Sequence, residues 1–238
     1  MQLTRTIFFF LIAIISTTLV NAQPGFTKGS CVLKDGQQLN GNFNLRTATA
    51  QSSAILVYYD RKEEQQFEPS EVKRCTLGRR SYIVGGNFVA PDDKAGIPVD
   101  RDFVEVIDTT GGIQLFRYEY EGYLNSSRGG YVIPMSVRAG SLPVMMYGGG
   151  AGGYRRTDIL LLRAGTKGPL VPYTPGPRIG LFTPAEEKII LVAVGATTAF
   201  FADDPELQKR IETGKLSEAR LGEAVRAYNA GVRLQLKN

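Results

Sequence analysis

The residue types that carry out most protein catalysis are scarce in this sequence. Histidine is absent from the whole chain. Its absence removes the usual general base, the usual partner of a serine or cysteine nucleophile, and the commonest zinc ligand. Catalysis would then depend on carboxylates or lysines. Three acidic groupings come into question: Asp92-Asp93, Asp100 with Asp102, and Asp203-Asp204.

None of these acidic groupings has a spacing that predicts a reaction centre. A glycosidase needs two carboxyl groups that face each other across a cleft, about 5–9.5 Å apart. Asp204 precedes Pro205, which favours a helix N-cap. Asp92-Asp93 lack the alternating acidic ligands of a calcium loop and are interpreted as a solvated turn. We therefore predict no catalytic, cofactor-binding or metal-ligating residue.

A glycine-rich stretch, Gly148 to Gly153, matches the dinucleotide-binding pattern G-x-G-x-x-G. That pattern binds a pyrophosphate only where a strand enters it and a helix leaves it. Here the chain continues into Asp158 to Leu162, which is typical of a strand. We interpret the stretch as a hairpin loop, with phosphate binding as the alternative.

Paired arginines and a set of tyrosines are the candidates for binding. We interpret Arg79-Arg80 and Arg155-Arg156 as solvated loop charges; contact with anionic polysaccharide or lipid headgroups is the alternative. Five tyrosines could line a face that binds sugar or peptide, although cross-strand packing explains them more simply. They are Tyr58, Tyr59, Tyr118, Tyr120 and Tyr123.

The two cysteines, Cys31 and Cys75, both fall in predicted strands. Two cysteines in an exported chain favour a disulfide, and two buried free thiols are the alternative. A bridge requires neighbouring strands with Cα atoms about 4.4–6.8 Å apart. In either case we expect a structural role.

Residues 1–22 have the pattern of a secretory signal peptide. Arg5 supplies the positive charge, Ile7 to Ile15 the apolar stretch, and Val20-Asn21-Ala22 the small-residue cleavage site. We predict cleavage between Ala22 and Gln23, with an uncleaved anchor as the alternative. The exported chain would be periplasmic, outer-membrane associated or secreted, and no transmembrane segment is expected after cleavage. Export makes nucleic acid an improbable partner, despite a net charge of +5.

The middle of the chain has the pattern of short strands. Residues 23–90 predict a small β-roll or barrel, whose first hairpin turns at Asp35-Gly36, a type I′ signal. Gly85 to Arg101 is interpreted as a linker. Residues 101–175 predict antiparallel hairpins, one of them turning at Gly111-Gly112, with further strands at 130–135 and 142–147.

The C-terminal residues 183–229 are the only long stretch with helical patterning. Thr183 with Glu186 predicts the start of a first helix. The uncharged segment Ile189 to Ala202 is apolar on every face, so we expect a buried core helix. Asp204 and Ser217 are expected to start two more helices, and residues 230–238 form a tail. The fold class expected is α+β, with a β-rich N-terminal part and a three-helix segment packed on it.

Several short motifs support a family resemblance. These are Lys34-Asp35-Gly36 with Gly41, Tyr58, Phe67 to Val72, Tyr82, Phe201 to Leu207, Ile211, and the closing Ala227-Tyr228-Asn229. On these residues the chain resembles an uncharacterised family of small secreted or envelope proteins of Bacteroidetes-type bacteria. The family has no established activity, so the resemblance implies an envelope location and no catalytic residues.

Three functions are compatible with this sequence. The first is non-enzymatic binding or scaffolding in the bacterial envelope, with another envelope protein or an anionic polysaccharide as partner. The second is a carboxylate-dependent envelope hydrolase that acts on a glycan. The third is an accessory subunit of an outer-membrane partner, docked through the last helix or through Val232, Leu234 and Leu236.

Overall fold

The structure is a computed structural model that describes residues 25–60, 63–91, 96–124, 153–175 and 184–232. The strands within these residues are β1 (Thr27–Leu33), β2 (Gln38–Arg46), β3 (Ala48–Thr49), β4 (Ile55–Asp60), β5 (Glu63–Phe67), β6 (Val72–Leu77), β7 (Arg80–Gly85), β8 (Phe88–Ala90), β9 (Ile97–Val99), β10 (Asp102–Asp108), β11 (Ile113–Leu124), β12 (Gly153–Ala164) and β13 (Val171–Pro172). The helices are α2 (Pro184–Thr198), the 3₁₀ helix η2 (Ala199–Phe201), α3 (Pro205–Glu212) and α4 (Glu218–Asn229).

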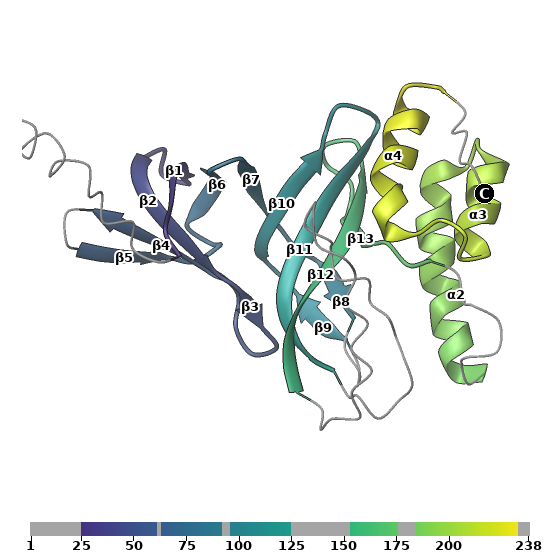
Figure 1. Cartoon of the computed structure of the whole chain (residues 1–238), viewed down its shortest axis with the longest axis horizontal. Helices are drawn as coiled ribbons and strands as arrows, with labels where there is room; N and C mark the ends of the chain where they lie inside the picture. The colour runs from purple at the N-terminus through teal and green to yellow at the C-terminus, as the bar shows by residue number, and fades with distance from the viewer. Residues whose placement is uncertain (1–24, 61–62, 92–95, 125–152, 176–183, 233–238) are drawn as a thin grey trace, which may run out of the picture.

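Most of these strands form a single large sheet. Its order is β13-β12-β11-β10-β7-β6-β1-β2-β4-β5, and β8 pairs only with β9. The helices gather at one end of the molecule, beside β11 to β13, while β4 and β5 lie at the other end (Figure 1). The expected α+β class is confirmed: a β-rich sheet carries a C-terminal three-helix segment.

The sheet curls because β2 continues into β3, which returns to a distant strand. Ala48 and Thr49 of β3 pair in parallel with Tyr120 and Glu121 of β11. The strands β11, β10, β7, β6, β1 and β2 therefore follow one another round to β3 and back to β11. The sequence predicted a small roll or barrel within residues 23–90, and here the curl also draws on β10 and β11.

The pairing register aligns one row of side chains across seven strands. Directly opposed residues share a face of a sheet. The row runs Leu39, Cys31, Cys75, Tyr82, Glu105, Arg117 and Leu160, from β2 to β12. Its first four members are buried and apolar or aromatic, whereas Glu105 and Arg117 are charged. One continuous face thus changes from a hydrophobic core to a charged surface.

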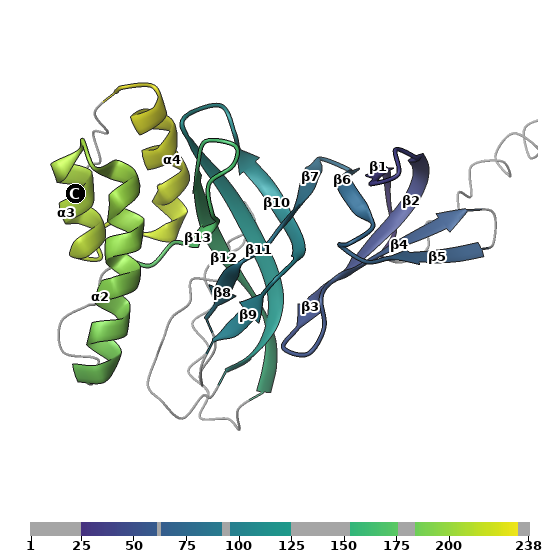
Figure 2. The same ribbon diagram turned by 180° about the vertical axis from the view of Figure 1, so that it is seen from behind.

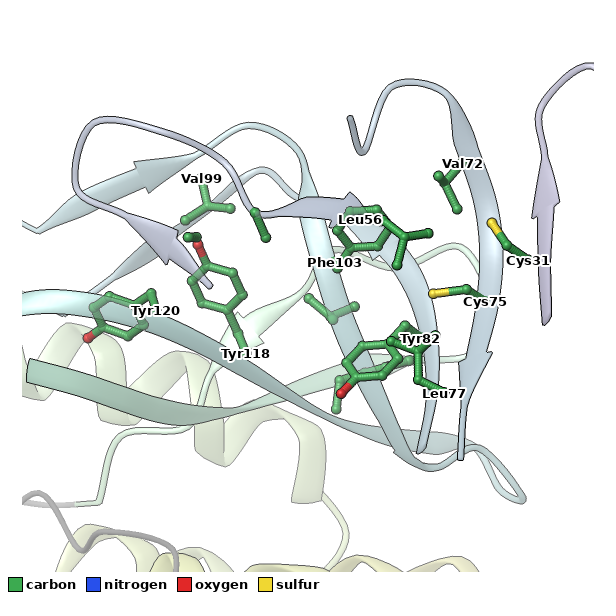
Figure 3. Close-up of a cluster of buried hydrophobic side chains, with 14 of the residues drawn as sticks. Cys31, Leu56, Val72, Cys75, Leu77, Tyr82, Val99, Phe103, Tyr118 and Tyr120 are labelled. Carbon is green, nitrogen blue, oxygen red and sulfur yellow. The ribbon is translucent and has the colours of Figure 1, made fainter. Parts of the chain in front are cut away.

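Two hydrophobic clusters hold the molecule together. The larger one, part of which Figure 3 shows, fills the curled sheet and also contains residues of the β8–β9 ribbon. There Phe88 meets the Tyr118 ring edge-on at 5.2 Å. The smaller cluster joins the helices to one end of β11 and β12, with Leu115 and Leu162 on the sheet side. Figure 2 shows the helices from behind, stacked beside α4, which lies along the sheet.

The end of α4 is fixed to the turn between β10 and β11. Asn229 accepts a hydrogen bond from the Ile113 amide (3.0 Å) and donates one to the Ile113 carbonyl (2.8 Å). A Cβ atom at Gly111 would lie 2.1 Å from Asn229 Cγ, so only glycine leaves room for this contact. The Gly111-Gly112 turn was predicted, and the structure adds a packing reason for its first glycine.

The first hairpin turns differently from the prediction. A type I′ turn needs positive φ at both central residues, but Gly36 (φ 93°) has positive φ and Asp35 does not. Instead, the Gly36 amide bonds the Leu33 carbonyl and the Leu33 amide bonds the Gln37 carbonyl. This is a three-residue loop that closes on a left-handed glycine. The Asp35 carboxylate accepts the Gln37 amide at 2.8 Å, which favours this turn.

The predicted linker Gly85 to Arg101 is wrong in part, because it contains β8 and β9. Short strands with Pro98 inside give little local signal, and the ribbon is stabilised by distant packing on Tyr118. After β12 the chain forms one more short strand, β13. The predicted strands at 130–135 and 142–147, the Gly148–Gly153 loop, Thr183 and the signal peptide 1–22 lie outside the described residues, although β12 includes Gly153 itself.

The helix starts and stops agree largely with the sequence signals. Asp204 caps α3 by accepting the Leu207 amide at 3.0 Å, and Gly214 (φ 64°) follows its end. Ser217 occupies the N-cap position of α4, but its hydroxyl makes no capping bond. Among the described residues, no helix is both long and apolar enough to cross a membrane.

The expectation that Ile189 to Ala202 is buried on every side is wrong in part. Val194, Thr197 and Phe201 are buried, but the side chains of Leu191 and Val192 are 59% and 71% exposed. Neighbouring helices cover one side of α2 and leave the other open. An apolar composition therefore did not indicate full burial.

Candidate functional site

A cavity of about 400 Å³ lies where the curled sheet opens. It is found at the end where β1 begins, β2 and β6 end, and β7 begins. Its apolar lining includes Phe43, Tyr82 and Phe103, which also belong to the core. Its charged lining consists of Arg80, Glu105, Arg117, Glu119 and Arg156, and the remaining lining residues are Gly25, Thr27, Asn44, Leu45, Thr47, Ala54 and Leu77.

Strand alternation positions the charged lining. On β11, Phe116, Tyr118 and Tyr120 point to one face, where they pack in the larger cluster. Arg117 and Glu119 alternate with them and so point to the other face. Farther along β11, that same face carries Leu115 against the helices. The charged residues thus occupy the stretch of the face between the helices and the core of the curled sheet.

The charged residues form an ion-pair network across four strands. Arg80 on β7 donates to Glu105 on β10 at 2.6 Å and also to Glu119 on β11. Arg156 on β12 donates to the other Glu119 oxygen. Burial by itself would raise the pKa of Glu119, but hydrogen bonds from Arg156 and Arg80 outweigh it and hold that pKa below its usual value. Glu119 is therefore a fixed carboxylate anion.

Arg117 lies at the centre of this network, beside two carboxylates. Its Nη1 is 3.6 Å from Glu105 and its Nε is 3.5 Å from Asp158, so both contacts are electrostatic. Neither is a hydrogen bond, and within the described residues the buried Nε atom has no hydrogen-bond partner. A guanidinium carries five donors and pairs well with planar carboxylates. Arg117 is consequently the strongest candidate for contacting an anion in the cavity.

The structure brings together only some of the residues singled out from the sequence. Arg80 and Arg156 line the cavity, whereas Arg79 is exposed outside it and the Arg155 side chain lies outside the described residues. Of the tyrosines, Tyr58, Tyr118 and Tyr120 are buried in the core, which agrees with cross-strand packing. Tyr123 has no described side chain.

The acidic groupings separate in the fold. Asp92-Asp93 lie outside the described residues. Asp100 is exposed, whereas Asp102 is 1% exposed and accepts hydrogen bonds from backbone amides and from Tyr118. Asp203 accepts the Tyr228 hydroxyl, and Asp204 is the α3 cap. Within the described residues, no group of three or more potential metal ligands occurs.

Sequence reasoning did not identify Glu105, Arg117 and Glu119. A signal was present, because each is a charge that alternates with buried β-branched or aromatic residues within a strand. That pattern indicates a charge on the inner side of a covered sheet. Which charges meet depends on the pairing of β7, β10, β11 and β12, and the sequence does not reveal this pairing.

A further carboxyl lies outside the cavity lining, at the start of α4. Burial, with a smaller contribution from the Asp158 charge, raises the pKa of Glu218 to about 7. The helix N-terminus favours a negative charge at this position, but burial prevails. Within the described residues no hydrogen bond to this carboxyl is formed. Ionisation of Glu218 therefore destabilises the native state.

Replacing Glu218 with glutamine is expected to stabilise the protein at alkaline pH. The pKa of Glu218 is higher in the folded protein than in the unfolded chain. Its contribution to stability is therefore complete below the pKa of the unfolded chain and is lost as pH rises through about 7. We expect the free energy of unfolding of the variant to exceed that of the wild type by about 1–3 kcal/mol at pH 8, and this difference should shrink towards pH 5. Urea unfolding across this pH range measures it. Glu223→Gln, exposed on the same helix, is the control, and equal pH profiles for both variants would refute the assignment.

Comparison of the chain with models of protein families, with curated proteins and with solved structures found no match.

Proposed function

We propose that this is an exported protein of the bacterial envelope that binds an acidic saccharide in the Arg117 cavity without transforming it. The observation that carries the proposal is the Arg117 guanidinium, which lines the cavity and whose Nε atom has no hydrogen bond to a described residue. The signal-like residues 1–22 support the export. The bacterial source rests on the family resemblance.

Size and chemistry both favour a sugar unit that carries a carboxylate. A volume of about 400 Å³ falls within the usual range for small-ligand sites. Tyr82 and Phe103 offer an apolar surface for a sugar ring, while Glu105 and Glu119 can accept hydrogen bonds from hydroxyl groups. Arg117 and the 60% exposed Arg156 can pair with a carboxylate.

The carboxylates of the cavity do not favour hydrolysis. A glycosidase needs one carboxylic acid with a raised pKa to protonate the leaving group. The pKa of Glu119 is lowered, and both Glu105 and Glu119 are paired to Arg80. These pairs support binding over catalysis, and for this reason we place the hydrolase second.

Replacing Arg117 with glutamine is expected to weaken the binding of an acidic trisaccharide. Loss of hydrogen bonds to a charged group costs about 1.5–3 kcal/mol, or roughly tenfold to hundredfold in affinity. Isothermal titration calorimetry with trigalacturonate, and with neutral maltotriose for comparison, measures this. Calorimetry is preferable to intrinsic fluorescence because the chain has no tryptophan.

The matched control is Arg74→Gln, which removes the same charge from an exposed position on β6. Its neighbour Cys75 points inward, so Arg74 faces the opposite side of the sheet. We expect this control to bind like the wild type. The proposal would be refuted if both variants lost affinity for trigalacturonate equally, if the wild type did not bind trigalacturonate, or if it bound maltotriose as tightly as trigalacturonate. Cleavage of trigalacturonate that is lost in Glu119→Gln would establish the hydrolase instead.

A further inference from the structure

The two cysteines lie directly opposite each other on neighbouring strands near the middle of the sheet. Cys31 of β1 pairs in register with Cys75 of β6. Both side chains lie among buried apolar residues such as Leu56 and Val72, on the inward face of the sheet (Figure 3). The sequence left a bridge and two buried thiols as alternatives. In the structure both cysteines are free and buried, and the geometry of the pair decides whether they could be linked.

The hydrogen bonds around this pair determine its type. In antiparallel pairs, hydrogen-bonded and non-hydrogen-bonded positions alternate. The Gly78 amide bonds the Lys28 carbonyl, so that pair, three positions from the cysteines, is hydrogen-bonded. On the other side of β1, the Leu33 amide bonds the Gln37 carbonyl, which places the hydrogen bonds of Cys31 towards β2. Both observations make Cys31 and Cys75 a non-hydrogen-bonded pair.

Such a pair has the spacing that a disulfide requires. Opposed Cα atoms in a non-hydrogen-bonded pair are about 4.5 Å apart, and disulfides span about 4.4–6.8 Å. Two adjacent cysteines on the same face therefore need no strand movement to be linked. A bridge here would join β1 to β6 and close the loop of chain that contains β2, β3, β4 and β5.

Access to these thiols is restricted in the folded protein. Cys31 is 1% exposed and Cys75 is 3% exposed, and the strands that carry them are flanked by β2 and β7. Burial raises the pKa of Cys31 to about 11 and, together with the nearby Cys31, that of Cys75 to about 12. Because the thiolate is the reacting form, thiol–disulfide exchange in the folded state should be slow.

We infer that Cys31 and Cys75 form a disulfide while the chain is folding, and that the closed sheet then shields it. A thiolate of the open chain attacks the disulfide of a small carrier, such as oxidised glutathione, and releases one carrier thiol. The second cysteine then attacks the mixed disulfide and releases the other. Two electrons and two protons pass from the cysteines to the carrier. This inference is independent of the proposed ligand.

Oxidative refolding of the full chain tests the inference. Reduced protein is unfolded in urea and refolded with oxidised glutathione, then alkylated and digested with trypsin without reductant. Cleavage at lysine and arginine releases Gly29–Lys34 and Cys75–Arg79, which we expect to be joined. The bridged protein should also melt roughly 5–10 °C above its reduced form. A parallel sample of folded, reduced protein should form the same bridge many times more slowly.

Two results would overturn the inference. Recovery of both peptides separately alkylated after oxidative refolding would show that the bridge does not form. Equally fast bridging in the folded, reduced sample would show that the sheet does not shield the pair. Cys31→Ala is the control for peptide assignment, because it must abolish the joined peptide. The peptide analysis does not depend on the stability of that variant.

Discussion

Replacing Asp102 with alanine should lower the free energy of unfolding by about 2–4 kcal/mol. Asp102 is 1% exposed and accepts hydrogen bonds from the Ala54 amide (3.2 Å), the Phe103 amide (2.7 Å) and the Tyr118 hydroxyl (3.0 Å). Removing it leaves buried donors without their acceptor. It also releases the chain after β3 from β10, where the curl of the sheet closes.

Thermal and urea unfolding measure this effect. The control is Asp100→Ala, two residues earlier and exposed, which should change stability by less than about 0.5 kcal/mol. Burial raises the pKa of Asp102 more than its hydrogen bonds lower it. The wild type should therefore lose part of its stability as pH rises above the pKa that Asp102 has in the unfolded chain. Equal stability of the two alanine variants would contradict this role for Asp102.

Replacing Phe201 with alanine should cost about 3–5 kcal/mol, the usual range for deleting a fully buried aromatic ring. Phe201 is 0% exposed and meets the ring of Tyr228 edge-on at 5.1 Å. It is the last residue of η2 and packs in the smaller cluster together with residues of α3 and α4. Loss of the ring would leave a cavity in the small cluster that holds the helices to the sheet.

Leu191→Ala is the matched control for Phe201, because Leu191 is 59% exposed on the open side of α2. Its change in the free energy of unfolding should stay within about 0.5 kcal/mol. Urea unfolding followed by circular dichroism compares the two. A loss below about 1 kcal/mol for Phe201→Ala, or similar losses for both, would mean that the helices pack differently.

Elements with strong local signals were predictable from the sequence. Asp204 before Pro205 predicted a capped helix start, and Gly214 predicted its end, because capping depends on neighbouring residues. The hairpin at Gly111-Gly112 was likewise predicted. The α+β class followed from these elements taken together.

Features that depend on distant contacts were not predictable. The β8–β9 ribbon is held by Phe88 on Tyr118, thirty residues along the chain. Which side of α2 is exposed depends on where the other helices lie, and composition does not carry that information. The turn at Asp35-Gly36 is a local exception: it was located correctly but given the wrong type, and the Asp35 side chain that accepts the Gln37 amide favours the observed turn.

The candidate site was the least predictable part. Arg80 and Arg156 were noted as members of basic pairs, but nothing local indicated that they converge on Glu119. Arg117 became a candidate only once the register placed it beside Glu105. Charges that alternate with aromatic residues in a long strand therefore merit more attention than adjacent charge pairs.

The most direct test of the account is a map of where trigalacturonate binds. Amide chemical shifts of isotope-labelled protein are followed by NMR spectroscopy during a titration. We predict shifts that concentrate around the Arg117 cavity, at the end of β2, the start of β7 and the middle of β10 and β11. Shifts concentrated instead at the hollow formed by Ile55, Phe67 and Glu71, or on α2, or no shifts at all, would contradict it.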